Sequence, residues 1–164
     1  MITHTVDLTV ANARAEQFYD FMISPSDERY SAWWPGEHIQ FHIVKHGDSN
    51  HTGDVVFMDE CLGKNHRLVF HAVVITAKRP NEITWQMKKA GIRLPAKVTL
   101  ELHDFSDGVK LKHELCIGFS GIGRILDPLI KLYFNHSFQS ALDEHCKIEW
   151  NKLAGFLNPP KAED

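Results

Sequence analysis

Hydrophobic and polar residues follow two different periods along this chain, one typical of strands and one typical of helices. The alternation from Thr5 to Val10 predicts a first strand, and apolar residues three and four apart then predict a helix over Ala13–Met22, N-capped by Asn12. The break at Ser24–Glu28 predicts a second, short helix reaching about Ala32. Six further segments rich in β-branched and aromatic residues predict strands separated by turns: Ile39–Lys45, Asp54–Cys61, Arg67–Ala77, Ile83–Lys88, Ala96–His103 and Val109–Phe119.

The C-terminal part of the chain predicts one long helix, from near Asp127 to near Leu157, with Pro128 in its first turn. Its apolar residues are spaced by three and four, so they fall on one face of the helix. This apolar stripe consists of Leu126, Leu129, Ile130, Tyr133, Phe134, Phe138 and Leu142, and it resumes at Leu153 and Phe156.

The order of these elements predicts an α+β domain. Consecutive strands joined by short turns favour an antiparallel sheet of about seven strands, with the two short helices after its first strand. One long helix must then cover the apolar face of that sheet. We therefore expect a curved sheet wrapped on the C-terminal helix, in a single domain over residues 1–157, with a loose tail over residues 158–164.

Composition excludes several classes of protein. Apolar residues make up 43% and charged residues 24% of the 164 residues, which argues against disorder. The net charge of -3, without a Lys/Arg block, argues against nucleic-acid binding. Because the first residues lead straight into a strand-like pattern, we expect no secretion signal, and because no apolar run approaches about 18 residues, we expect no membrane span. The odd number of widely spaced cysteines, Cys61, Cys116 and Cys146, predicts reduced thiols, so we expect a cytoplasmic protein.

Two ionisable residues interrupt the apolar stripe of the long helix. If the steps of three and four are continued from Leu142 towards Leu153, they land on His145 and Glu149. Burying either group without a partner would cost several kcal/mol, so each is expected to have one. A His and a Glu four residues apart on a helix can reach a single metal ion. A His–Glu hydrogen bond on a partly wet helix edge is the alternative interpretation.

Two earlier segments also carry candidate chemistry. The segment WWPGEH, residues 33–38, places two tryptophans, a turn and His38 where a strand begins, which suits the rim of a pocket or, alternatively, a turn pinned by core tryptophans. The segment GDVVFMDECLG, residues 53–63, ends an apolar strand with Asp59 and Glu60. Both faces of that strand are apolar, so the alternation does not decide which carboxylate points inward, and a bulge would change the answer again.

One further histidine, His113, belongs to an apolar row that alternates with Lys110, Lys112 and Glu114. We expect it to face an internal cavity, either as a hydrogen-bonded core residue or as an acid/base contact to a substrate. We expect Trp34, Phe138 and Leu142 to line the same cavity and to bind a small apolar or aromatic molecule.

The order of elements resembles the helix-grip fold of the START and pollen-allergen (SRPBCC) superfamily, which includes polyketide cyclases and holds ligands between sheet and C-terminal helix. Within that fold, WWPGEH, GDVVFMDECLG and HCKIE are similar to the zinc-binding pattern of the diacetylphloroglucinol hydrolase family, which cleaves a carbon–carbon bond next to an aryl ketone. The resemblance implies four zinc ligands in this chain: His38, Glu60, His145 and Glu149. Two imidazoles and two carboxylates suit zinc, and manganese, iron or nickel also use such ligands.

Three functions follow as hypotheses. The first is a metal-dependent hydrolase of a polyketide-like ketone, in which zinc polarises a carbonyl and a water molecule. The second is a metal-free carrier or sensor of a hydrophobic ligand. The third is a polyketide cyclase in which His113 and a carboxylate move protons without a metal. Metal content separates the first hypothesis from the other two, and turnover separates the third from the second.

Overall fold

The structure is a computed structural model that describes residues 1–62, 66–119, 121–126, 128 and 134–159. Its described strands form one antiparallel sheet in the order β1-β7-β6-β5-β4-β3-β2, so only β1 and β2 lie at edges. Each neighbouring pair from β2 to β7 is consecutive in sequence, as expected for strands joined by short turns. The strands are β1 (Ile2–Ala11), β2 (His38–Lys45), β3 (Val55–Leu62), β4 (His66–Lys78), β5 (Glu82–Lys89), β6 (Ile92–Phe105) and β7 (Gly108–Ile117).

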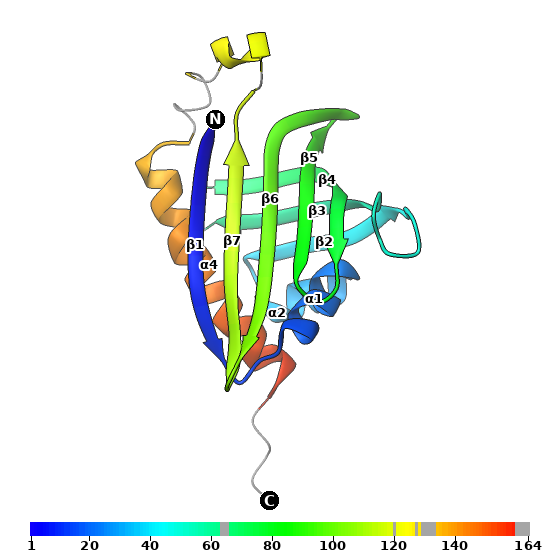
Figure 1. Ribbon diagram of the computed structural model, residues 1–164, viewed down its shortest axis with the longest axis vertical. Helices are drawn as coiled ribbons and strands as arrows, with labels where there is room; N and C mark the ends of the chain where they lie inside the picture. The colour runs from blue at the N-terminus through cyan, green and yellow to red at the C-terminus, as the bar shows by residue number, and fades with distance from the viewer. Residues whose placement is uncertain (63–65, 120, 127, 129–133, 160–164) are drawn as a thin grey trace, which may run out of the picture.

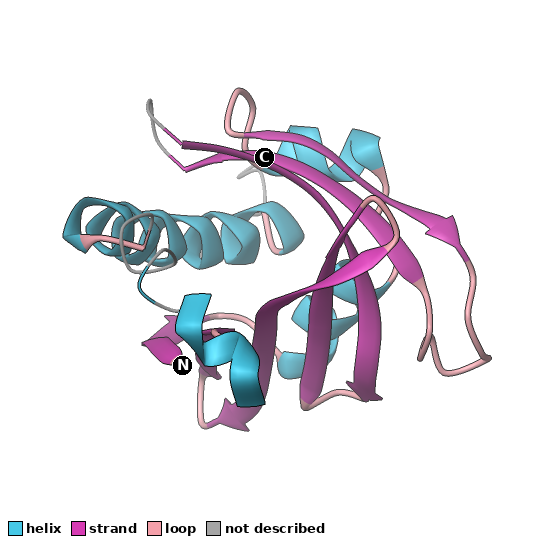
Figure 2. Ribbon diagram, turned by 90° about the horizontal axis from the view of Figure 1, so that it is seen from above, coloured by secondary structure: helices cyan, strands magenta, loops and turns pink. Residues whose placement is uncertain are grey.

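Two short helices, α1 (Ala15–Ile23) and α2 (Asp27–Trp33), follow β1, and the long helix α4 (His136–Leu157) ends the fold. A 3-10 helix, η1 (Gly121–Leu126), follows β7. The sheet curves strongly, and α4 lies on its concave side (Figures 1 and 2). This is the α+β arrangement that the sequence predicts: a curved antiparallel sheet wrapped on the C-terminal helix.

The start of the long helix differs from the prediction. Helix α4 begins at His136, because Asn135 has extended backbone (φ -84°, ψ 176°) and its side chain accepts a hydrogen bond of 3.0 Å from the Phe138 N–H. A single helix running from near Asp127 is therefore wrong. Asn side chains favour such local bonds to the backbone, so Asn135 acts as an N-cap where the apolar period alone predicts helix interior. Leu129, Ile130 and Tyr133 of the predicted stripe lie outside the described residues.

The end of α4 is fixed as well. The Asn158 N–H donates to the carbonyl oxygen of Ala154, and its side-chain amide donates to that of Asn12 at 3.0 Å. Gln17 of α1 donates to the Asn158 side chain at 2.8 Å. The first residue of the predicted loose tail is thus tied to two other segments, and residues 160–164 lie outside the described residues.

The hydrophobic core lies between the concave face of the sheet, α4 and α1. On α4, Phe138, Leu142, Cys146, Trp150 and Leu153 are buried. The aromatic rings of the two helices meet, with the Trp150 ring centroid 6.0 Å from that of Phe18 and the Phe156 ring centroid 5.9 Å from that of Phe21. Among the described residues, no helix combines the length and hydropathy of a membrane-crossing segment.

The packing of α4 predicts a large difference between two aliphatic truncations on this helix. Leu153 is 0% exposed, so Leu153→Ala should lower the free energy of unfolding by about 2–5 kcal/mol through lost burial and the cavity left behind. Ile148 is 39% exposed, and Ile148→Ala should change the free energy of unfolding by no more than about 0.5 kcal/mol. Urea unfolding of the two variants measures both values, and equal losses would contradict the packing described for α4.

Candidate functional site

An internal cavity of about 250 Å³ lies between the sheet and α4. Most of its wall is apolar and comes from β3 to β7 and from α4. Phe138, Leu142 and His113 line it, as the sequence analysis expects, whereas Trp34 does not belong to its wall. The polar residues of the wall are Tyr30, Glu60, His113, His145, Cys146 and Glu149.

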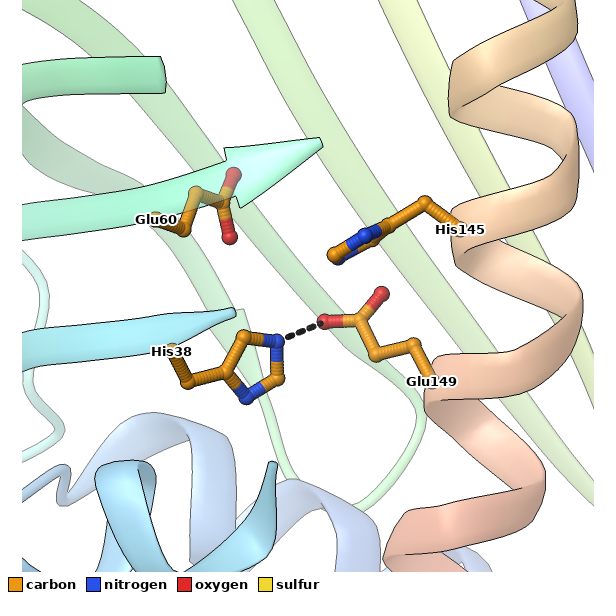
Figure 3. Close-up of side chains that lie close together, drawn as sticks. All are labelled: His38, Glu60, His145 and Glu149. Atoms are coloured by element: carbon orange, nitrogen blue, oxygen red, sulfur yellow. Dashed lines mark ion pairs between the residues drawn. The ribbon is translucent and has the colours of Figure 1, made fainter. Parts of the chain in front are cut away.

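Four ionisable side chains converge at one end of the site. Each offers one nitrogen or carboxylate oxygen, and these four atoms all lie within 4.8 Å of one another. The four are the residues singled out in the sequence: His38, Glu60, His145 and Glu149. Figure 3 shows them pointing toward one another across the gap between two strands and α4. Three of them, all but His38, also line the cavity.

A β-bulge brings His38 into this cluster. From Gln40 to Ile43, β2 pairs regularly with β3, but His38 pairs with Glu60 and Gln40 with Asp59, so Ile39 is an extra residue. On a regular strand His38 would share the face of Gln40 and His42, both of which contact Asp27. The bulge reverses the alternation and turns the imidazole inward, where it is 1% exposed.

The two adjacent carboxylates of β3 point in opposite directions. Asp59 forms a bidentate ion pair with Arg67 of β4, with contacts of 2.8 and 2.7 Å. Glu60 accepts a hydrogen bond of 2.7 Å from the Tyr30 hydroxyl and faces the cluster. The alternation of β3, with Val56 and Met58 on the cavity wall, places Glu60 on the same inward face.

Burial sets the protonation of the cluster. It raises the pKa of Glu60 to about 7, helped by the nearby charge of Glu149, and it raises the pKa of Glu149 to about 7. Burial lowers the pKa of His38 to about 4, against the attraction of Glu60 and Glu37. Burial also lowers the pKa of His145. Around neutral pH the histidines are neutral and each carboxyl group is close to half protonated, so a bound cation would displace protons from the carboxyl groups.

One nitrogen of each histidine in the cluster lacks a hydrogen-bond partner among the described residues. The Nε2 atoms of His38 and His145 are buried, and neither forms a hydrogen bond with any described residue. Nε2 of His38 lies 3.5 Å from a carboxylate oxygen of Glu149, at the outer limit of such a bond. Buried nitrogens without partners are uncommon in folded proteins, and here two of them face two carboxylates. This donor set fits a divalent cation.

Three aromatic residues, Tyr30, Trp33 and Trp34, pack against the residues of the cluster. The Tyr30 ring stacks on His38, with centroids 4.1 Å apart and an interplanar angle of 5°. The indole N–H of Trp33 donates to the Glu149 carbonyl oxygen at 3.2 Å. The Trp34 ring stacks on the His145 ring, with centroids 4.6 Å apart. Trp34 therefore contacts a residue of the cluster instead of lining the cavity as expected. Tyr30 is not among the site residues predicted from the sequence, because the short segment around it carries no signal of a site, and only the structure shows its contacts with His38 and Glu60.

His113 stands apart from the four-residue cluster. It lies on the inner face of β7, between Val6 of β1 and Leu100 of β6. Its Nδ1 is 3.4 Å from the Cys146 sulfur on α4. Burial lowers its pKa to about 4, with smaller contributions from the charges of His145 and His4, so the ring is neutral at pH 7.

Comparison with known proteins identifies the fold. No protein-family model matches the chain, and neither does any curated protein sequence. Solved structures match over nearly its whole length. The Aha1 dimer from Colwellia psychrerythraea matches with a TM-score of 0.62 at 11% identity, over 99% of this chain and 100% of that chain. Ara h 8.0201 matches with a TM-score of 0.63 at 10% identity, over 95% and 97% of the two chains.

A third match is the di-domain ARO/CYC protein BexL from the BE-7585A biosynthetic pathway, with a TM-score of 0.62 at 11% identity. Here the alignment covers 96% of this chain and 51% of that chain. Identities of this size carry no information about shared chemistry, but the agreement in architecture is close. The chain therefore has the helix-grip fold, as its sequence predicts.

The neutral state of His113 predicts a pH dependence of stability. The ordinary pKa of a histidine is about 6.5, so the unfolded chain takes up this proton first as the pH falls. With a folded pKa of about 4, His113 reduces stability progressively from pH 6.5 towards pH 4. When the pH is lowered from 7 to 5, the free energy of unfolding of His113→Gln should therefore fall by about 2 kcal/mol less than that of the wild type. Urea unfolding at both pH values tests this, with the exposed His46→Gln as control; identical losses in all three proteins would refute it.

Proposed function

We propose that this protein binds a small apolar molecule in the cavity and holds a divalent metal ion, zinc in the first place, on His38, Glu60, His145 and Glu149. The observation that carries the proposal is the convergence of four metal-binding atoms within 4.8 Å at the wall of an apolar cavity. Two nitrogens and two carboxylate oxygens are a common donor set for zinc. An ion bound there would be in direct contact with a molecule bound in the cavity.

The apolar cavity supports the ligand half of the proposal. Its volume of about 250 Å³ corresponds to roughly eight water molecules at about 30 Å³ each. The wall is built from residues such as Leu100, Phe70, Met87 and Trp85, which bind apolar surface and exclude solvent. This size favours a compact ligand over a long-chain lipid.

Because the cluster borders the cavity, we extend the proposal to metal-dependent hydrolysis of a polyketide-like ketone, the reaction that the sequence resemblance implies. When bound, zinc supplies Lewis acidity towards a carbonyl and towards water. The chain itself would orient the ligand between apolar walls, exclude bulk water and keep Glu60 in place through the Tyr30 hydroxyl. His113, neutral and on the same wall, is the proposed acid/base group.

Two alternatives share the fold and the cavity. A carrier or sensor of a hydrophobic ligand needs the apolar walls alone, and a polyketide cyclase needs His113 with a carboxylate. Incubation of the zinc-loaded protein with diketone and aryl ketone substrates, followed by liquid chromatography with mass spectrometry, distinguishes the three, since an isomeric product differs from the substrate in retention time. Cleavage products indicate the hydrolase, an isomeric or dehydrated ring indicates the cyclase, and unchanged but bound ketone indicates the carrier.

The metal proposal predicts one zinc ion per chain in protein purified without a metal-affinity column. Glu149→Gln and His145→Ala should each weaken zinc binding at least 100-fold, because each removes one of four ligands. Both variants should keep the fold, since Leu142 and Leu153 still anchor the helix. Elemental analysis and zinc titration measure these effects. A control is Asp59→Asn on the other face of β3, where Asp59 binds Arg67. It should bind zinc like the wild type. An equal loss in Asp59→Asn would show that the effect is not specific to the four ligands, and unchanged binding in Glu149→Gln and His145→Ala would show that zinc binds elsewhere.

The cavity proposal predicts that filling the space blocks ligands. Ala96 lines the cavity and is 8% exposed, so Ala96→Phe would place a ring where a ligand binds. Binding of ethylbenzene, followed by NMR titration, should weaken at least 10-fold. Ala32 is exposed on α2, and Ala32→Phe should leave the affinity unchanged. Wild-type affinity in Ala96→Phe would show that ethylbenzene binds elsewhere.

A further inference from the structure

The contact between His113 and Cys146 is not used by the proposed metal cluster. The two residues come from β7 and α4, and both line the cavity. The sulfur of Cys146 lies 3.4 Å from Nδ1 of His113, within the range of a hydrogen bond to sulfur. Among the described residues, no other group accepts a hydrogen bond from the thiol, whose sulfur otherwise meets only its own backbone N–H, and no other group bonds the imidazole ring. The second ring nitrogen, Nε2, is therefore left without a hydrogen-bond partner among those residues.

The chemistry of the two groups fixes the direction of this bond. A thiol has an ordinary pKa of about 8.5 and keeps its proton in an apolar wall at neutral pH. Sulfur is a weak acceptor, whereas a neutral imidazole nitrogen is a good one. If Nδ1 carried the proton, the thiol hydrogen would have no acceptor among the described residues. The favoured arrangement is S–H donating to Nδ1, which leaves the imidazole proton on Nε2.

We propose that Cys146 is a positioning residue that holds His113 in the tautomer with its proton on Nε2, so that the cavity wall presents an N–H donor to the bound molecule. This inference rests on the proposed ligand-binding function and narrows its ligand class. The ligand has an apolar body and a hydrogen-bond acceptor that meets His113. His113 lines the same cavity as His145, Glu149 and Glu60, so this donor and the metal cluster face the same space.

The tautomer can be read by NMR. Long-range proton–nitrogen correlation spectra of the protein, with and without zinc, should show Nδ1 of His113 unprotonated and Nε2 protonated. Cys146→Ala removes the thiol donor and should produce a mixture of tautomers. Cys146→Ser offers a hydroxyl donor at the same position and should restore the wild-type tautomer. A proton on Nδ1 in the wild type, or an unchanged tautomer in Cys146→Ala, would overturn the proposal.

Ligand recognition is tested with ethylbenzene and benzonitrile, which have the same number of non-hydrogen atoms and differ in one acceptor. Chelator-treated protein is used, so that the nitrile cannot bind a metal. Benzonitrile should gain roughly 2- to 12-fold in affinity relative to ethylbenzene through one net hydrogen bond. That gain should disappear in His113→Phe, shrink in Cys146→Ala and return in Cys146→Ser.

The two proposals fail in different ways. If ethylbenzene does not bind the wild type at all, the ligand-binding function is wrong, while the NMR spectrum still decides the tautomer. If ethylbenzene binds and benzonitrile gains nothing over it, the cavity binds apolar ligands but His113 is not a donor to them. If Cys146→Ala does not fold, the wild-type spectrum and Cys146→Ser still decide the outcome.

Discussion

The desolvation of two carboxylates, Glu60 and Glu149, is the constraint on which the site depends. Each lies in an apolar wall, and burial raises each pKa from the ordinary value of 4.5 to about 7. Their contribution to folding stability therefore falls as the pH rises from about 4.5 to about 7, and the full cost of ionising them in the folded state is present above pH 7. The neighbouring neutral histidines offer nitrogen lone pairs but no positive charge. A divalent cation would satisfy all four groups at once, because it replaces lost hydration with direct ligation.

Two separate features of the fold position these groups. Helix α4 presents His145 and Glu149 one turn apart on the face that meets the sheet, between the apolar anchors Leu142 and Leu153. The bulge at Ile39 turns His38 inward beside Glu60. The stacked rings of Tyr30 and Trp34 then restrict the two imidazoles. Ligand geometry is therefore built into packed elements rather than into loops, and such sites lose little entropy when they bind.

The sequence predicts much of this fold because its signals are local. Alternation in β1, and β-branched and aromatic segments bounded by turns in β2 to β7, identify every described strand to within a few residues. The apolar stripe of α4 identifies His145 and Glu149 by the gap they leave. The predicted start of the long helix is wrong because the hydrogen bond between the Asn135 side chain and the Phe138 N–H caps α4 at a position where the spacing of apolar residues predicts helix interior. The orientation of His38 could not be derived from alternation, since a bulge is a property of the paired strands.

The residues that contact the site side chains could not be predicted from the local sequence either. The sequence around Tyr30 and Cys146 indicates no partner for either residue, and only the packing of distant elements brings them to Glu60 and His113. Trp34 illustrates the opposite error: an aromatic residue beside a candidate ligand suggested a cavity wall, but it stacks on the outside of His145. Tertiary contacts, not residue type, decide which of these roles a side chain takes.

Anomalous X-ray diffraction at the zinc absorption edge, on crystals grown with one equivalent of zinc, tests the central claim most directly. The account predicts a single strong peak between β2, β3 and α4, with one nitrogen each from His38 and His145 and one oxygen each from Glu60 and Glu149 at about 2.0–2.2 Å. A peak held by other residues, or no peak with the four side chains arranged as they are here, would contradict it.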